Sequence, residues 1–262
     1  MEFFATAANL AVHIRDSKKG EKAVLLLHGY METLYIWNDF FDALKRDYRV
    51  IAIDLPGHGL SCSAPVNTIE LMATVAKGVL DLCEVKQAAV VGHSLGGYVA
   101  LKCCELFPET FEKMVLLNSH PYPEPESFAT VREREINIIN SGRLQSLAEI
   151  SIPKMFHSNN LRRLDSKIRE IVELCETHDP SGIVASVKGF TKRSDMSEYL
   201  KNTSTPTLAI CGDSDGFISS ELQLKMLEQF KNMKLVTLQE CGHNVFLECP
   251  EKCLELVREF IG

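Results

Sequence analysis

Short apolar runs recur along the chain, and longer segments with helical spacing separate most of them. The predicted strands are residues 3–6, 10–14, 23–27, 48–53, 88–91, 113–117, 207–211 and 234–238. The predicted helices of the same regions are residues 34–45, 68–83, 98–107, 220–230 and 250–261. Strands that alternate with helices predict an α/β fold, because each helix carries the chain back to the start of the next parallel strand. We therefore expect a doubly wound, mostly parallel eight-stranded sheet with helices on both faces.

The strand pattern stops between residues 120 and 203, where four amphipathic segments follow one another. These predicted helices are residues 131–139, 144–150, 164–175 and 183–190. Helices without strands, inserted between two strands of a sheet, predict a separate cap over the sheet. We expect residues 1–119 and 204–262 to form the α/β core and residues 120–203 to form the helical cap.

Composition narrows the class of protein further. The 262 residues are 45% hydrophobic and 24% charged, which is typical of one large globular domain that builds its own core. The net charge of −7 disfavours nucleic acid or an anionic membrane as a partner. No apolar segment reaches the roughly 20 residues that cross a bilayer, and the first residues do not resemble a signal peptide. Nine cysteines without a C-x-x-C pair indicate reduced thiols, so we expect a cytoplasmic protein.

The segment with the clearest chemistry is Gly92-His93-Ser94-Leu95-Gly96, a G-x-S-x-G motif between a predicted strand and a predicted helix. A serine on such a sharp turn has its hydroxyl pushed out of the backbone into a cleft. The flanking glycines are needed because a Cβ would clash with the tight backbone. The motif is short enough to occur by chance, so its meaning depends on what surrounds it in the fold.

Other polar turns follow other predicted strands. They are His28-Gly29-Tyr30, Asp54 to Ser61, Gly212 to Asp215, and Gly242-His243. Each comes just past the carboxyl end of a strand, where open α/β sheets place their ligands. Together with the serine motif, these residues resemble the α/β-hydrolase family, specifically serine hydrolases with a helical cap, over nearly the whole chain.

The resemblance implies a catalytic triad in the chain order Ser94, Asp215 and His243. His243 would take the proton of Ser94, and Asp215 would orient and stabilise the imidazolium that forms. Asp213 competes with Asp215 for that role but is expected to be a turn residue. The resemblance also implies an oxyanion hole from the backbone N–H groups of Tyr30 and Leu95.

The substrate pocket is expected to draw on aromatic and histidine side chains of the cap and of the turns. The candidates are His120, Tyr122, Phe156, Phe190, Phe217 and Phe246, while His13 and His178 are expected at the surface. Arginines of the predicted cap, such as Arg132, could bind a carboxylate of the substrate. The simpler interpretation is that they lie on a solvated helix face and form ion pairs with nearby carboxylates. The triad requires no metal and no organic cofactor.

These features predict a hydrolase that cleaves a small carboxylic ester, a thioester or a lactone through an acyl-enzyme on Ser94. Related enzymes use the same triad for hydrolysis of a carbon–carbon bond or for lyase chemistry of the menaquinone-pathway type. The lyase branch often carries an arginine where this chain has Tyr98, which disfavours that alternative. A small-molecule receptor on the same fold is the alternative of another class. The partner in every case is a small molecule.

Overall fold

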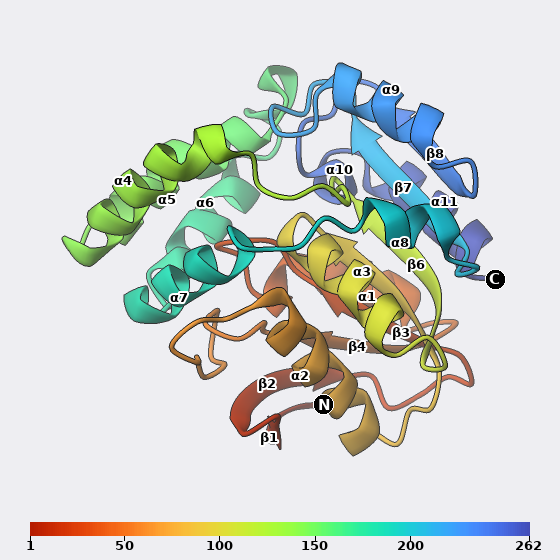
Figure 1. Ribbon diagram of the computed structural model, residues 1–262. Coiled ribbons are helices and arrows are strands. Elements are labelled where there is room, and N and C mark those ends of the chain that lie inside the picture. The colour runs from red at the N-terminus through yellow and green to blue at the C-terminus, as the bar shows by residue number, and fades with distance from the viewer.

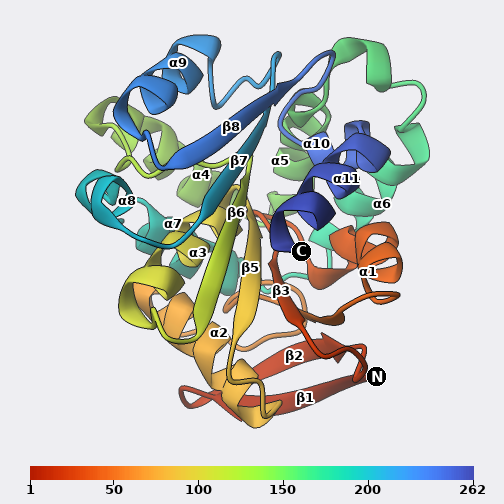
Figure 2. The ribbon, with the colours of Figure 1, turned by 90° about the vertical axis from the view of Figure 1, so that its right-hand side faces the viewer.

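The computed structural model describes residues 1–262, and its centre is one twisted eight-stranded sheet (Figures 1 and 2). The strands are β1 (Glu2–Ala7), β2 (Leu10–Asp16), β3 (Ala23–Leu27), β4 (Arg49–Ile53), β5 (Ala88–His93), β6 (Phe111–Leu117), β7 (Thr207–Gly212) and β8 (Met233–Leu238). Their order across the sheet is β1-β2-β4-β3-β5-β6-β7-β8. The predicted mostly parallel, eight-stranded α/β fold is confirmed.

Only the first two strand pairings are antiparallel. β1 pairs with β2 and β2 pairs with β4 in this way, whereas the other five pairings, from β4-β3 to β7-β8, are parallel. Parallel strands are joined by helices that cross over the faces of the sheet. All the carboxyl ends of the parallel strands therefore lie along one edge, and the turns that follow them meet there.

Apolar side chains of the central strands alternate between two cores, one on each face of the sheet. In β3, Leu25 and Leu27 point into one core, and Val24 and Leu26 point into the other. Both faces of a parallel sheet are covered by helices, so every side chain of a central strand is buried. The strands therefore appear in the sequence as unbroken apolar runs. The helices α2 (Ile69–Leu82), α3 (Leu95–Leu106) and α9 (Ser220–Gln229) cover the first face, and α1 (Asn38–Leu44) and α11 (Pro250–Ile261) cover the second.

Local signals in the sequence fix the ends of these helices. The Thr68 hydroxyl accepts the N–H of Leu71 and caps α2, and Ser219 caps α9 in the same way by accepting from Leu222. Pro250 occupies the first turn of α11, where its missing N–H leaves no hydrogen bond unmade. None of the helices is both long enough and apolar enough to cross a membrane.

Between β6 and β7 the chain contains helices and turns but no strand; we call residues 118–206 the helical insertion. Its helices are α4 (Ala129–Asn140), α5 (Leu144–Ser151), α6 (Asp165–Cys175), α7 (Pro180–Phe190) and α8 (Ser197–Asn202). Figure 1 shows α4 to α7 grouped beside the sheet. The sequence pattern predicts α4 to α7 to within a few residues, but it misses α8 and the four-residue α10 (Val245–Glu248), both too short for a periodic pattern.

Two histidines expected at the surface are buried, which corrects the sequence interpretation. His13 lies on β2 with its ring between the carboxylates of Asp54 and Glu2, at 2.7 and 2.9 Å. His178 lies in the helical insertion and accepts a hydrogen bond from the Gly59 N–H at 2.8 Å. Their hydrogen-bond partners are distant in sequence, so no local pattern reveals that these polar rings are buried.

Candidate active site

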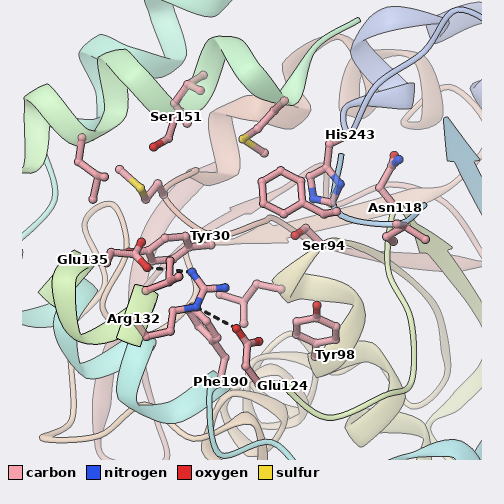
Figure 3. Close-up of a pocket in the computed structure, with 18 of the residues that line it drawn as sticks. Tyr30, Ser94, Tyr98, Asn118, Glu124, Arg132, Glu135, Ser151, Phe190 and His243 are labelled. Atoms are coloured by element: carbon pink, nitrogen blue, oxygen red, sulfur yellow. Dashed lines mark hydrogen bonds and ion pairs between the residues drawn. The ribbon is translucent and has the colours of Figure 1, made fainter. Parts of the chain in front are cut away.

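The turns after five parallel strands meet at one edge of the sheet. They carry Tyr30 after β3, Ser94 after β5, Asn118 after β6, Asp215 after β7 and His243 after β8. All but Asp215 line one cavity of about 380 Å³ between the sheet and the helical insertion, and Asp215 lies directly behind His243. Figure 3 shows Ser94 and His243 directed into this cavity.

Ser94 occupies a strained turn between β5 and α3. Its φ of 49° and ψ of −111° lie outside the regions that side-chain-bearing residues favour. The turn is possible because Gly92 and Gly96 have no side chains. A Cβ on Gly92 would lie 2.2 Å from the Gly96 carbonyl oxygen, and one on Gly96 would lie 2.1 Å from that of Leu27. The sequence thus folds locally so that the Ser94 hydroxyl is presented to the cavity.

His243 is paired with Asp215 and not with Asp213. The His243 Nδ1 lies 2.9 Å from Asp215 Oδ2 and 3.0 Å from Oδ1. Asp213 instead accepts from the backbone N–H of Cys241 and from the Ser214 hydroxyl, as expected of a turn residue. No hydrogen bond joins Ser94 to His243 in this structure; such contacts are often loose until a substrate is in place.

Asn118 is a site residue that the sequence interpretation missed. Its Nδ2 donates to Asp215 Oδ2 at 2.8 Å and to the Gly242 carbonyl at 3.1 Å, while its Oδ1 accepts the Val245 N–H. An asparagine after a strand gives no chemical signal in the sequence, but in the structure its amide holds the acid in place. Burial raises the pKa of Asp215, but His243 and the Asn118 amide outweigh burial and lower that pKa to about 2. Asp215 therefore stays ionised at neutral pH.

Two residues beside Ser94, Tyr30 and Leu95, have backbone N–H groups without an acceptor in the protein. The Tyr30 N–H, in the turn after β3, donates to no acceptor in the protein. Leu95 is the first residue of α3, and the first N–H groups of a helix have no intrahelical acceptor. Both residues line the cavity beside Ser94. The structure thus brings together all five residues predicted for the triad and the oxyanion hole.

The backbone of His243 is held from two sides. Its N–H donates to the Met155 carbonyl of the helical insertion at 2.6 Å, and its carbonyl lies 2.8 Å from His93 Nε2. The neighbouring carboxylate of Glu248 accepts from the Gly242 N–H and the His157 N–H, both at 2.8 Å. The sequence interpretation missed Glu248, because a glutamate in a short helix carries no signal of burial. Together these contacts fix the turn that presents the imidazole ring.

The cavity is apolar on most of its wall. Its apolar lining residues are Tyr30, Met31, Leu95, Tyr98, Val131, Ile138, Leu147, Ile152, Met155, Phe190, Phe217 and Ile218. Three of the side chains predicted for the pocket, His120, Phe190 and Phe217, line it. Cavities of this size and polarity are typical of small-molecule sites.

Three other side chains predicted for the pocket lie elsewhere, which corrects that part of the interpretation. Phe156 is buried in the core that joins the helical insertion to the sheet. Phe246 packs against Trp37 in the core of the second face, with ring centroids 4.4 Å apart. Tyr122 leans away toward α9, where its hydroxyl donates to Gln229. These three residues lie in the parts of the chain that were expected to border the pocket. Their side chains point elsewhere, because side-chain direction depends on tertiary packing that the sequence pattern does not contain.

A partly buried cluster of ion pairs forms one wall of the cavity (Figure 3). Arg132 Nε donates to Glu124 Oε1 at 2.9 Å, and its Nη1 donates to Glu135 Oε2 at 2.8 Å. Arg193 pairs with the other oxygen of Glu124 and stacks on the Tyr98 ring. Arg132 thus makes the ion pairs expected of it but faces the cavity and not solvent. The two arginines and two glutamates leave this wall with no formal net charge.

Comparison of the sequence with known protein families identifies the family of this chain. The sequence model of the α/β hydrolase fold matches residues 22–250. The chain belongs to the α/β-hydrolase family, and it is a hydrolase. No group of three or more histidine, cysteine, aspartate or glutamate side chains is placed to hold a metal ion.

The relatives include enzymes with different reactions. A 2-hydroxy-6-oxononadienedioate/2-hydroxy-6-oxononatrienedioate hydrolase of a Pseudomonas species is 26% identical over 97% of this chain and 93% of its own. A pimeloyl-[acyl-carrier protein] methyl ester esterase of Nitrosomonas europaea is 26% identical over 92% of this chain and 96% of its own. The structure of a thermophilic esterase from Thermogutta terrifontis superposes with a TM-score of 0.92 at 25% identity, covering 100% of this chain and 98% of that one.

Proposed function

We propose that this protein is a carboxylic ester hydrolase that forms an acyl-enzyme on Ser94. The observation that carries the proposal is the convergence of four groups on one mainly apolar cavity. They are the Ser94 hydroxyl, the His243 ring paired with Asp215, and the N–H groups of Tyr30 and Leu95. Nucleophile, base, orienting acid and oxyanion donors are the parts that acyl transfer requires.

The proposed reaction has two halves. The Ser94 Oγ attacks the ester carbonyl carbon while His243 Nε2 accepts its proton, and the oxyanion is stabilised by the Tyr30 and Leu95 N–H groups. The protonated His243 then gives its proton to the departing alkoxide, which leaves as an alcohol. Water attacks the acyl-enzyme with His243 again as base, releases the carboxylic acid and restores the Ser94 hydroxyl. The helical insertion would act as a lid that excludes bulk water from these steps.

Carbon–carbon bond hydrolysis is the second candidate, because a relative that matches 97% of the chain is named for a dienedioate substrate. A dioate carries two carboxylates, which require cationic partners in the cavity. Here the partly buried arginine of the wall, Arg132, is already bonded to Glu124 and Glu135. Arg134 also lines the cavity, but it is exposed, and solvent screens its charge. The balanced wall favours an uncharged acyl group and so favours ester hydrolysis.

The substrate class is tested with matched acyl donors. We expect higher kcat/KM for the p-nitrophenyl ester of hexanoate than for the mono-ester of glutarate, by about 10-fold or more, because the terminal carboxylate loses its hydration beside Glu124 and Glu135. The same enzyme is then assayed with lactones and with 2-hydroxy-6-oxo-dienoic acids. Faster turnover of the diketone-type acids than of any ester would overturn the proposal in favour of the second candidate.

Chain-length preference should depend on Phe190 and not on Phe156. Both phenylalanines are buried in the helical insertion, at 4% and 6% exposure, but only Phe190 lines the cavity. Phe190→Ala should shift the preferred acyl length and change ratios of kcat/KM by about 10- to 100-fold, since apolar contacts discriminate by about 1–3 kcal/mol per methylene-sized change. Phe156→Ala should lower the unfolding midpoint and leave the profile of acyl lengths in place. Equal profiles in the two variants would contradict the cavity assignment.

A further inference from the structure

Behind the candidate active site lies a buried carboxylate–imidazole pair that the proposed reaction does not use. Glu32 follows the turn after β3, His93 precedes Ser94, and the two side chains are 1% and 0% exposed. Glu32 Oε2 lies 2.9 Å from His93 Nδ1 and accepts the Gly29 N–H at 2.6 Å. On its other side, His93 Nε2 lies 2.8 Å from the carbonyl oxygen of His243.

The hydrogen bonds of this pair determine its protonation. A carbonyl oxygen only accepts, so His93 Nε2 carries a proton for the contact with His243. The Glu32 oxygen that faces Nδ1 also accepts the Gly29 N–H, which favours the ionised carboxylate, and an ionised carboxylate requires a second proton on Nδ1. Burial lowers the pKa of His93, but the Glu32 charge outweighs burial and raises it; the pKa of Glu32 shifts in the opposite direction, because the His93 charge outweighs its burial. The contacts and the opposite directions of the two pKa shifts both favour an imidazolium bonded to a carboxylate.

The pair joins three separate turns of the site. Glu32 holds the Gly29 N–H, next to the oxyanion donor Tyr30. His93 is part of the Ser94 turn, and its ring reaches the His243 carbonyl, with the two imidazole centroids 5.2 Å apart. The sequence separations are 61 residues between Glu32 and His93 and 150 between His93 and His243. No other side-chain pair of the site bonds to all three turns.

We infer that Glu32 and His93 are positioning residues for the hydrolase reaction, whose imidazolium–carboxylate bond sets the relative placement of Ser94, the His243 ring and the Tyr30 N–H. This inference rests on the proposed function, because it assigns these three groups to one reaction. Small displacements of reacting groups are costly, and a shift of about 1 Å can lower a rate by about 10²-fold. Loss of the pair therefore affects the rate of the chemical step more than substrate binding.

The chain contains a matched control, the buried pair His13–Asp54. Asp54 Oδ2 lies 2.7 Å from His13 Nδ1, and Asp54 also accepts backbone N–H groups from Leu34 and Leu60. Both carboxylates are fully buried and both bond an imidazole and the backbone. The Asp54 pair bonds the chain after β3 only at Leu34, four residues past Tyr30, and makes no hydrogen bond to the turns that carry Ser94 or His243. A purely structural role predicts the same consequences for both pairs.

The test compares Glu32→Gln with Asp54→Asn, each of which replaces one oxygen by an amide NH₂. One atom, Glu32 Oε2, serves both Gly29 and His93, so a glutamine either faces the Gly29 N–H with a donor or leaves the His93 charge unpaired. We expect Glu32→Gln to lower kcat by about 10- to 100-fold with KM within about threefold. Asp54→Asn should leave kcat within about twofold, although both variants lower the unfolding midpoint.

A second measurement needs no active variant. Nitrogen-15 NMR of the imidazole side chains of the native protein, with His93→Gln used for assignment, should show protons on both ring nitrogens of His93 at pH 7.5. Equal kcat in Glu32→Gln and Asp54→Asn, or a His93 ring with a single proton, would overturn the inference. Failure of the proposed function is a separate outcome: it would appear as full activity of Ser94→Ala. That result does not depend on the number of protons on the His93 ring.

Discussion

Ser94→Ala is expected to abolish ester hydrolysis and covalent labelling by a fluorophosphonate, with a fall in kcat of at least about 10⁴-fold. The reason is that Ser94 is the hydroxyl presented by the strained turn between β5 and α3, beside His243 and the free N–H of Tyr30. Alanine fits the same backbone, so the fold and the cavity should persist. Intact-mass spectrometry before and after the fluorophosphonate measures the loss of labelling directly.

Peptide mapping of the labelled native protein identifies the modified residue. Ser151 lines the same cavity and provides the control, since it lies at the end of α5 in the helical insertion and not on the strained turn before α3. The Ser151→Ala variant should still take up one fluorophosphonate group, on Ser94. A label on Ser151 in the native protein, or an unchanged rate in Ser94→Ala, would be incompatible with the proposed acyl-enzyme.

Asp215→Asn is expected to lower kcat by about 10⁴-fold, by analogy with the loss of the acid from a serine-protease triad. Donors surround both oxygens of Asp215. Oδ1 accepts the N–H groups of Phe217 and Ile218, and Oδ2 accepts the amide of Asn118, while His243 Nδ1 lies within 3.0 Å of both. An amide NH₂ at either position faces another donor, so the variant loses both the charge and the orientation of the imidazole.

Asp213→Asn is the matched comparison, with the same change of atoms two residues away. Asp213 uses one oxygen to accept from Cys241 and Ser214, and asparagine presents an oxygen equally well. Its kcat should therefore stay within about threefold of the native value. Steady-state kinetics of the two variants, with circular dichroism to verify folding, decides the assignment. A larger loss of kcat in Asp213→Asn than in Asp215→Asn would show that Asp215 is not the residue that orients His243.

The sheet was predictable because its strands are buried on both faces. Val24 to Leu27 form one apolar run, and the alternation of its side chains between two cores is the reason that the run is unbroken. The Ser94 turn was predictable for a related reason, since its glycines are required by contacts as short as 2.1 Å. Where backbone geometry demands a residue type, the sequence reveals the structure.

Side-chain direction and buried polar partners were not predictable in this way. Phe156 and Phe190 have the same chemistry and both lie in the predicted cap, yet one joins a core and the other faces the cavity. Glu32, Asn118 and Glu248 become meaningful only through partners at least 60 residues away or in short irregular turns. A single sequence has no local signal for such contacts, because tertiary packing brings the partners together.

The carboxylate of Glu248 has a consequence for recombination between relatives. It accepts from the Gly242 N–H beside His243, and from the His157 N–H and the Asn160 amide of the helical insertion, each at 2.8 Å. Residues 155–160 and 242–248 thus form one unit, although 80 or more residues separate the contacts in sequence. A chimaera that exchanges only the segment between β6 and β7 would keep the Gly242 donor to Oε1 but would remove the native partners of the buried Oε2, His157 and Asn160. A chimaera that takes the helical insertion of a relative therefore also needs residues 242–248 from that relative.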